Sequence, residues 1–317
     1  MKKIFVTRKL LKINEERISK LWEAKLNLDD KIYSEEELIE LSKDCDGILC
    51  SILDKIDKKL INKLSDKVKI LSNFAVGFGN IDIEAAKKRN IIVTNTPDVL
   101  TDSTAEIAML LILGACRRVI EGLWWAKNKK WAWSTDFLLG KQLFGSNLGI
   151  LGMGRIGRAV AKRARAFGMI IHYHNRSKLK PDLEMGAIYH DNIQSLFSVS
   201  DVLSINCPAT KETHNIINKK TLKFFPSGAI ITNSARGDMI DDNAMVEALK
   251  SKKIYALGLD VYKGEPDINP GYLDQPNVFV LPHLGSATVK TRTDMADLAI
   301  SNIEEFFKKG TCVNKVN

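Results

Sequence analysis

The sequence predicts an α/β protein made of two doubly wound units, each with a parallel sheet. Three observations support this fold class. Short β-branched runs alternate with charged stretches of helical spacing along the whole chain. The 317 residues correspond to roughly two domains of ordinary size. A glycine-rich turn near the middle, at residues 152–157, follows one predicted strand and opens one predicted helix.

The composition is that of an ordinary globular protein. Apolar residues make up 45% of the chain and charged residues 27%, which excludes a disordered chain. The longest apolar run, residues 107–116, is too short to cross a bilayer, and the N-terminus lacks the apolar segment of a signal peptide. The five cysteines form no CxxC pair or metal-binding cluster. We therefore expect reduced thiols, a cytoplasmic protein, no metal and no membrane contact.

The net charge of +9 raises the question of a nucleic-acid partner. The lysines alternate with acidic residues, as in residues 34–44 and 54–60, which is typical of solvated helix faces. We therefore expect no nucleic-acid partner. The positive field instead favours small anions and anionic cofactors.

The first hundred residues contain four predicted strands separated by helical stretches. The strands are residues 4–7, 47–50, 69–74 and 91–95, and the helical stretches are residues 16–26, 35–44, 57–66 and 82–90. A break at 96–103, which includes Pro97, marks a domain boundary. It precedes a helix expected from Thr104 to about Asn128, capped by Ser103 or Thr104, with Glu106 in the first turn.

A second α/β series follows. Its predicted strands are residues 148–154, 169–175, 201–207, 229–234, 255–261 and 277–283, and a last helix covers about 288–309. Before this series, residues 124–133 hold four of the five tryptophans. They either pack under a loop or form an interface, where tryptophan is enriched.

Residues 152–157 fit the pattern G-x-G-x-x-G. In such a turn Gly152 permits the tight bend, Gly154 lets a pyrophosphate approach the backbone, and Gly157 lets the helix pack on the strand. Arg155 and Ile156 lie inside the turn, where the positive helix end and N–H groups hold phosphates. Because a strand precedes the turn and a helix follows it, the pattern predicts a dinucleotide site.

The next strand ends at Asn175, Arg176 and Ser177, followed by Lys178. A site selective for NAD places an acidic residue here to bind the ribose hydroxyls. That acid is absent, and a 2′-phosphate would meet hydrogen-bond donors and positive charge instead. The residues favour NADP(H), with NAD(H) possible; the alternative is an ordinary exposed basic loop.

Three polar side chains follow three successive strands of the second series. They are Arg236, Glu265 and His283, and Gly285 lies two residues after His283. The carboxyl ends of strands in a doubly wound sheet converge on the crevice that holds the ligand. We therefore expect these side chains to meet beside the nicotinamide.

At this point the sequence resembles the D-isomer-specific 2-hydroxyacid dehydrogenases. The matching segments are GILGMGRIGRAVAKRARAFGM, NSARGDMIDDNAMVEAL, ALGLDVYKGEP and LPHLGSAT, together with NFAVGFGNIDIEAAKKRNIIVTNTP near residues 73–97. The AVGFGNID segment and the tryptophan-rich segment are most similar to glyoxylate/hydroxypyruvate reductases. The resemblance implies two Rossmann-like, flavodoxin-like domains. A substrate-binding domain (1–98 plus 287–317) would carry an inserted NAD(P)-binding domain (99–286).

The resemblance also implies a role for each site residue in reducing a small 2-keto acid to the 2-hydroxy acid. His283 would donate the proton, Glu265 would hold the other imidazole nitrogen, and Arg236 would bind the substrate carboxylate. Backbone N–H groups of Val76 and Gly77 resemble the family's second carboxylate contact. With His283 and Arg236, the substrate site would include Gly285.

Further contacts follow from the resemblance alone. Those expected on the cofactor side are Thr104, Cys207, Pro208, Ala235 and Asp260. Cys207 stands where the family usually has a bulkier hydrophobic residue. Trp133 is expected to reach into the partner's substrate site in a homodimer, as a tryptophan does in the glyoxylate/hydroxypyruvate subgroup.

Other functions stay open on the sequence alone. A dinucleotide-sensing corepressor-like binding protein could retain the same three residues. An enzyme like phosphoglycerate dehydrogenase is a second alternative, although we expect no regulatory domain because the sequence ends too soon for one. The Glu265–His283 combination argues against formate dehydrogenase, which uses glutamine with its histidine.

Overall fold

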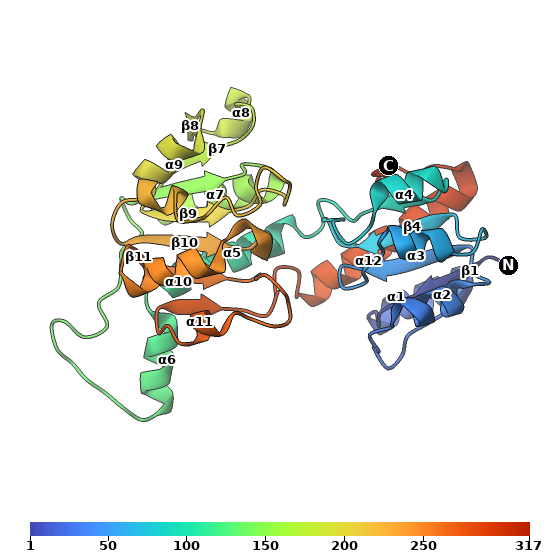
Figure 1. The fold of residues 1–317 in the computed structure, drawn as a ribbon, viewed down its shortest axis with the longest axis horizontal. Coiled ribbons are helices and arrows are strands. Elements are labelled where there is room, and N and C mark those ends of the chain that lie inside the picture. The colour runs from blue at the N-terminus through green and yellow to red at the C-terminus, as the bar shows by residue number, and fades with distance from the viewer. The chain divides into compact units, whose positions relative to one another are not determined.

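The computed structural model describes residues 1–317, and the chain divides into two compact units (Figure 1). Unit 1 comprises Met1–Leu100 and Ala287–Asn317, and unit 2 comprises Thr101–Ser286. Each unit contains one sheet whose strands are all parallel, so the predicted fold class is confirmed. None of the helices combines the length and the apolar character that a membrane span needs.

Unit 1 is built on a five-stranded sheet in the order β2-β1-β3-β4-β5. Its strands are β1 (Lys3–Val6), β2 (Glu23–Lys25), β3 (Gly47–Ser51), β4 (Ile70–Phe74) and β5 (Ile92–Thr94). β3 and β4 are almost wholly buried, as expected of central strands covered on both faces. β5 lies at one edge, where the C-terminal segment pairs with it through an antiparallel bridge between Thr94 and Lys315.

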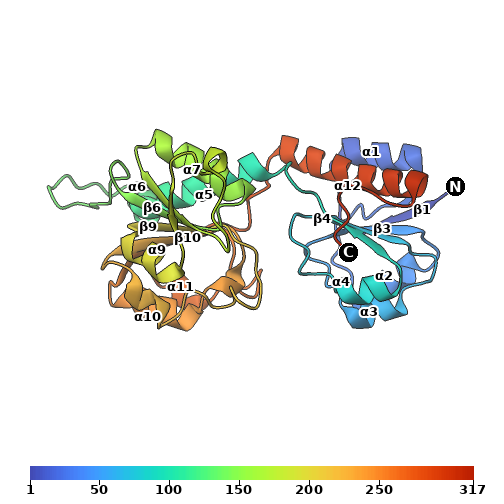
Figure 2. The same ribbon diagram turned by 90° about the horizontal axis from the view of Figure 1, so that it is seen from above.

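Helices cover both faces of this sheet (Figure 2). Helices α1 (Lys12–Leu21) and α12 (Val289–Lys309) lie on one face, and α2 (Glu35–Ser42), α3 (Lys58–Lys63) and α4 (Ile83–Lys88) lie on the other. α12 buries Ala296, Ala299, Ile300 and Ile303 against the first face. The predicted last helix is confirmed, with Thr288 as its N-cap.

Unit 2 has a seven-stranded sheet in the order β12-β11-β10-β9-β6-β7-β8. Its strands are β6 (Asn147–Leu151), β7 (Ile170–His174), β8 (Ile188–His190), β9 (Val202–Ile205), β10 (Ala229–Asn233), β11 (Ile254–Leu259) and β12 (Val278–Val280). The chain builds outward from β6 in one direction and from β9 in the other. The boundary between β6 and β9 is therefore the topological switch point, where doubly wound sheets bind their ligands.

The helices of unit 2 also form two layers (Figure 2). They are α5 (Thr101–Cys116), α6 (Val119–Lys127), α7 (Arg155–Ala166), α8 (Pro181–Glu184), α9 (Ile193–Val199), α10 (Asp242–Lys250) and α11 (Pro270–Leu273), with 3-10 turns at Thr221–Phe224 and Gly237–Met239. α5 and α7 pack on one face of the sheet, and α9 and α10 pack on the other. The face under α9 and α10 holds the larger apolar cluster of the unit.

Two predicted helices differ from the structure. The helix expected from Thr104 to Asn128 begins earlier, at Thr101, so Thr104 is not its cap and Glu106 is not in its first turn. It also breaks after Cys116, because Arg118 adopts a left-handed conformation (φ 53°) and the Lys141 N–H caps the Cys116 carbonyl. The helix expected over 16–26 stops at Leu21, and residues 23–25 form β2 instead.

Candidate active site

The glycine-rich turn joins β6 to α7 as predicted. Gly152 has φ 96°, and a Cβ at this position would lie 2.5 Å from the Cys207 backbone nitrogen. A Cβ on Gly157 would overlap the Gly152 carbonyl oxygen. Both positions therefore exclude a side chain, the first for its backbone conformation and both for the close approach of neighbouring backbone.

Gly154 differs from these two glycines. It occupies the N-cap position of α7, where it has no side chain to bond the first N–H groups of the helix. A Cβ placed on it would meet no atom within 4 Å. α7 begins at Arg155, followed by Ile156, and the N–H groups of a first helical turn are not used within the helix. The turn thus leaves open space beside donors and a positive helix end, which fits a dinucleotide pyrophosphate.

The loop after β7 supports this turn. The Asn175 Oδ1 accepts a hydrogen bond of 2.7 Å from the Met153 N–H, so this side chain, predicted to contact cofactor, holds the glycine turn in place. Arg176, Ser177 and Lys178 follow, and all three are exposed. No acidic residue stands at this strand end.

The end of β9 borders the same turn, and β10 is the next strand of the sheet. Cys207 packs behind Gly152, and its Sγ lies 3.8 Å from the Met239 Sδ. Burial raises the pKa of Cys207 to about 11, so the thiol is a neutral packing group there. The oxygens Asn206 Oδ1 and Ser234 Oγ are buried without a hydrogen-bond partner in the protein. These unpartnered polar atoms suit an edge that receives a polar ligand.

His283 and Glu265 form a short polar contact in the site. The His283 Nδ1 lies 2.6 Å from the Glu265 Oε2, and the Glu265 Oε1 accepts from the Tyr262 N–H at 3.1 Å. Burial alone would raise the pKa of Glu265, but the hydrogen bond and charge of His283 outweigh it and lower that pKa. Both oxygens of an ionised carboxylate are therefore used, one of them to fix the imidazole.

The backbone around His283 is held in an uncommon conformation. His283 has φ 56°, a left-handed value that is rare for a residue with a side chain. Its N–H donates to the Asp260 carbonyl, and the Asp260 carboxylate accepts from the Leu284 N–H (2.6 Å) and the Gly285 N–H (2.8 Å). Strain of this kind persists only where several contacts enforce it, and it clusters at functional sites.

Asp260 and Thr104 were both predicted to contact the cofactor. Asp260 is only 1% exposed, and burial raises its pKa above the ordinary value even though two N–H groups bind it. The Thr104 hydroxyl donates to the Gly285 carbonyl at 3.1 Å. In the structure both side chains therefore support the loop that carries His283.

Arg236 comes from the turn after β10. Asn233 shapes this turn, because its side chain accepts from the Ala235 N–H and donates to the Arg236 carbonyl. A Cβ on Gly237 would overlap the Tyr262 backbone, so the turn of Arg236 lies directly against the segment that leads to Glu265. Burial lowers the pKa of Arg236, and the charge of Glu265 acts against that shift.

The structure therefore brings Arg236, Glu265 and His283 to one edge of unit 2. Pro208 and Ala235 lie at the ends of β9 and β10 on that edge. Val76 and Gly77 belong to unit 1, in the loop that joins β4 to α4, and both are half-buried. Trp133 lies in the segment between α6 and β6 and is 90% exposed.

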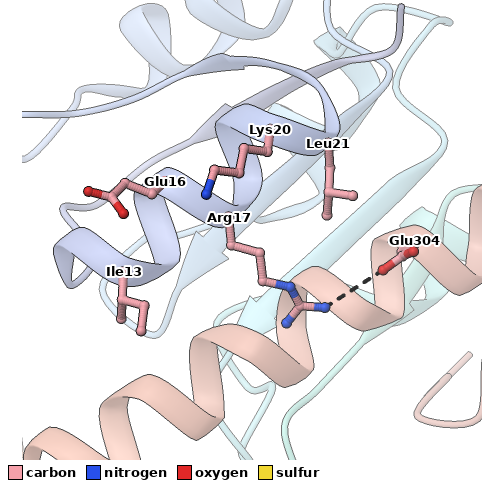
Figure 3. Close-up of a pocket in the computed structure, with 6 residues that line it drawn as sticks. All are labelled: Ile13, Glu16, Arg17, Lys20, Leu21 and Glu304. Atoms are coloured by element: carbon pink, nitrogen blue, oxygen red, sulfur yellow. Dashed lines mark ion pairs between the residues drawn. The ribbon is translucent and has the colours of Figure 1, made fainter.

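A separate cavity of about 360 Å³ lies in unit 1 between α1 and α12. Figure 3 shows its lining, which consists of Ile13, Glu16, Arg17, Lys20, Leu21 and Glu304. Arg17 is already engaged there, at 2.8 Å from the Asp297 Oδ1 and 3.6 Å from the Glu304 Oε2. None of the residues predicted for catalysis or binding lines this cavity.

Comparison with known proteins places this geometry in a family. Residues 109–285 match the family described as D-isomer specific 2-hydroxyacid dehydrogenase, NAD binding domain. The chain is 41% identical over 322 residues to a glyoxylate reductase of Thermococcus litoralis, covering 99% of this chain and 96% of that protein. It is 40% identical over 309 residues to a glycerate dehydrogenase of Hyphomicrobium methylovorum, covering 96% of each.

Solved structures agree with the sequence matches. An NADPH-dependent glyoxylate/hydroxypyruvate reductase from Sinorhizobium meliloti, in complex with NADP and malonate, superposes with a TM-score of 0.89 at 32% identity. The match covers 99% of this chain and 96% of that one. From its paired histidine and glutamate, its glycine-rich turn and these full-length similarities, the chain belongs to the D-isomer-specific 2-hydroxyacid dehydrogenase family.

Proposed function

We propose that the protein reduces a small 2-keto acid, glyoxylate or hydroxypyruvate, to the D-2-hydroxy acid with NADPH as its preferred reductant. The observation that carries this proposal is the Glu265–His283 contact of 2.6 Å beside the turn that bears Arg236. The names of the relatives support the same substrate class, since they include glyoxylate reductases and a glycerate dehydrogenase.

His283 supplies the proton in this proposal. When bound, the reduced nicotinamide would supply the hydride that the keto carbon needs. The imidazolium of His283 would give its proton to the keto oxygen, which would leave an alcohol and a neutral imidazole. Glu265 accepts from the Nδ1–H, so the Nε2 side of the ring is the one available to substrate. Solvent returns the proton before the next turnover.

Arg236 binds the substrate carboxylate and polarises the keto group. Its guanidinium holds several N–H donors in one plane. This arrangement matches the two oxygens of a carboxylate better than the ammonium group of a lysine does. The N–H groups of Val76 and Gly77 provide the second carboxylate contact, and Gly285 lines the substrate site. Together these contacts fix which face of the keto carbon receives the hydride.

In this proposal the glycine turn and the loop after β7 bind the cofactor. Gly152, Gly154, Gly157 and the start of α7 at Arg155 and Ile156 hold the pyrophosphate. Arg176 and Ser177 bind the 2′-phosphate of NADPH. Support comes from their exposure, from the missing acid, and from the NADP complex of the similar reductase from Sinorhizobium meliloti. NAD(H) binds more weakly in this proposal.

We also propose a cytoplasmic homodimer that uses the tryptophan-rich segment. Trp124, Trp131 and Trp133 are 51%, 85% and 90% exposed, which is a large apolar area for a free surface. Trp133 would reach the partner's substrate site. Light scattering on the purified protein tests the dimer, and a monomeric mass would contradict it.

The test of the activity is a kinetic panel with glyoxylate, hydroxypyruvate, pyruvate and larger 2-keto acids, each with NADPH and NADH. We expect the highest kcat/KM with glyoxylate and hydroxypyruvate as substrates and NADPH as reductant. His283→Asn should lower kcat by at least about 100-fold while NADPH binding persists, because the variant keeps the ring's approximate size but loses the proton donor. A near-normal kcat in this variant would remove His283 from its role.

A further inference from the structure

The loop that follows β4, residues 75–80, carries two backbone N–H groups whose direction determines how well they can bind an anion. They belong to Val76 and Gly77, which the proposed function assigns to the substrate carboxylate. Neither N–H donates a hydrogen bond within the protein. Because the two donors must converge on one carboxylate, the planes of the peptides that carry them decide how well they bind it.

Those planes are fixed from the carbonyl side. In a planar trans peptide the C=O of one residue points opposite to the N–H of the next, and the cis peptide of this chain lies elsewhere. The Thr96 N–H donates to the Ala75 carbonyl at 2.9 Å, which sets the direction of the Val76 N–H. The Asn95 Nδ2 donates to the Val76 carbonyl at 2.9 Å, which sets the direction of the Gly77 N–H.

A second asparagine holds the other end of the same loop. The Asn73 Nδ2 donates to the Gly77 carbonyl at 2.9 Å and to the Asn80 Oδ1 at 3.2 Å. Asn73 is fully buried in β4, so its replacement would disturb the core of unit 1. Asn95 is half-buried just after β5, and its side chain can be changed with less damage.

Asn95 is itself held by two further asparagines. The Asn302 Nδ2 on α12 donates to the Asn95 carbonyl at 2.9 Å, and the Asn95 N–H donates to the Asn314 carbonyl at 3.2 Å. Asn314 in turn donates from its Nδ2 to the Asn302 Oδ1 at 2.9 Å. The backbone of Asn95 is therefore fixed by α12 and the C-terminal segment, which leaves its side-chain amide directed at the loop.

We propose that Asn95 is a positioning residue that orients the Gly77 N–H toward the substrate carboxylate. The inference rests on the proposed function, because it takes Val76 and Gly77 as the carboxylate contact. Asn95 does not touch the substrate. It prevents rotation of the Val76–Gly77 peptide, so that both N–H groups present their partial positive charge to the same anion.

The test compares Asn95→Ala with the wild-type protein in steady-state kinetics with glyoxylate and NADPH. We expect KM for glyoxylate to rise about 10-fold, as for the loss of one well-aligned hydrogen bond to a charged group, while kcat falls much less. The inhibition constant of oxamate, which carries the same carboxylate, should rise by the same factor. The Kd of NADPH should not change.

Asn277→Ala is the matched control. The Asn277 Nδ2 donates to the Tyr255 carbonyl at 2.6 Å, so this variant removes the same kind of contact from unit 2. It should leave KM and the oxamate constant unchanged. If Asn95→Ala does not fold, Asn95→Ser retains a small polar side chain too short to reach Val76, and it should show the same rise in KM.

The outcomes separate the two proposals. Wild-type protein that reduces no 2-keto acid would overturn both the proposed function and the role of Asn95. Wild-type turnover combined with an unchanged KM in the Asn95 variant would overturn only the role of Asn95. An equal rise in KM in the Asn277 variant would show that the effect is not specific to Asn95 and would also overturn its role.

Discussion

The Nδ1 atom of His283 lies 2.6 Å from the Oε2 atom of Glu265, and the backbone at His283 is left-handed. The Glu265 carboxylate holds the imidazole at Nδ1 only. Its second oxygen accepts a hydrogen bond from the Tyr262 N–H. The ring therefore has one orientation, and its second nitrogen is left for chemistry. The same contact determines how activity should respond to mutation at Glu265.

Glu265→Gln should lower kcat for keto-acid reduction by about 10- to 100-fold at pH 7.5. A neutral amide can still accept the Nδ1–H bond, but it no longer supplies the negative charge that stabilises a charged imidazole ring. The pKa of Glu265 lies below its ordinary value, so the wild-type carboxylate is ionised at this pH. A kcat equal to that of the wild type would contradict the role of Glu265.

Arg236→Ala should raise KM for the keto acid about 100-fold and also lower kcat, because the carboxylate anchor orients the carbonyl. Arg236→Lys keeps the charge but loses the planar donor pair, so it should recover only part of the loss. Initial rates over a range of glyoxylate concentrations measure both effects. Equal KM values in the wild type and the alanine variant would assign the carboxylate to other groups.

Arg176→Ala should reduce kcat/KM for NADPH about 10-fold and leave kcat/KM for NADH nearly unchanged, because only NADPH carries the 2′-phosphate. Lys180→Ala, an exposed lysine in the same loop, is the control and should change neither value. If the ratio of the two cofactors is the same in Arg176→Ala as in the wild type, Arg176 is an ordinary surface residue.

The edge of the unit 2 sheet holds a histidine pair that should make stability depend on pH. The His172 Nδ1 lies 2.9 Å from the His190 Nε2, and the His190 Nδ1 lies 3.1 Å from the Ser195 Oγ. Burial, more than any neighbouring charge, lowers the pKa of both rings, and the mutual repulsion of His172 and His190 lowers that of His172 further.

A lowered histidine pKa means that the unfolded chain binds protons more readily than the folded one, so stability is complete above about pH 6.5 and is lost as the pH falls below it. Asp201 and Asp191 oppose the shifts of His172 and His190 but do not cancel them. We expect Tm to fall by about 2–4 °C between pH 7.5 and 5.5. His190→Gln should flatten this dependence, whereas His214→Asn should leave it intact.

Much of the fold could be predicted because its strands are short buried runs with strong β-branched character. The two missed strands lack that signal. β2 is the sequence Glu-Ala-Lys, which favours a helix, and it becomes a strand only through pairing with β1. β8 is three residues long and contains His190. The helix break at Arg118 was also unpredictable, since arginine rarely adopts a left-handed backbone.

The candidate site could be predicted as a set of residues but not as a set of contacts. The strand ends predicted that Arg236, Glu265 and His283 lie near one another, and the structure brings them to one edge of unit 2. The sequence could not show that Asp260 and Asn175 direct their side chains at backbone N–H groups of the site loops. Asn95 was missed altogether, although asparagine just after a strand is a common backbone-binding residue and could have been a signal.

The division of unit 1 into two segments affects the order in which the protein can fold during synthesis. Its first hundred residues leave the ribosome early, yet α12 covers one face of their sheet and the C-terminal segment pairs with the edge strand β5. Unit 2 is one continuous piece of chain and needs neither. Unit 1 therefore cannot complete its core or cover its edge strand until unit 2 and the residues that follow it have been made.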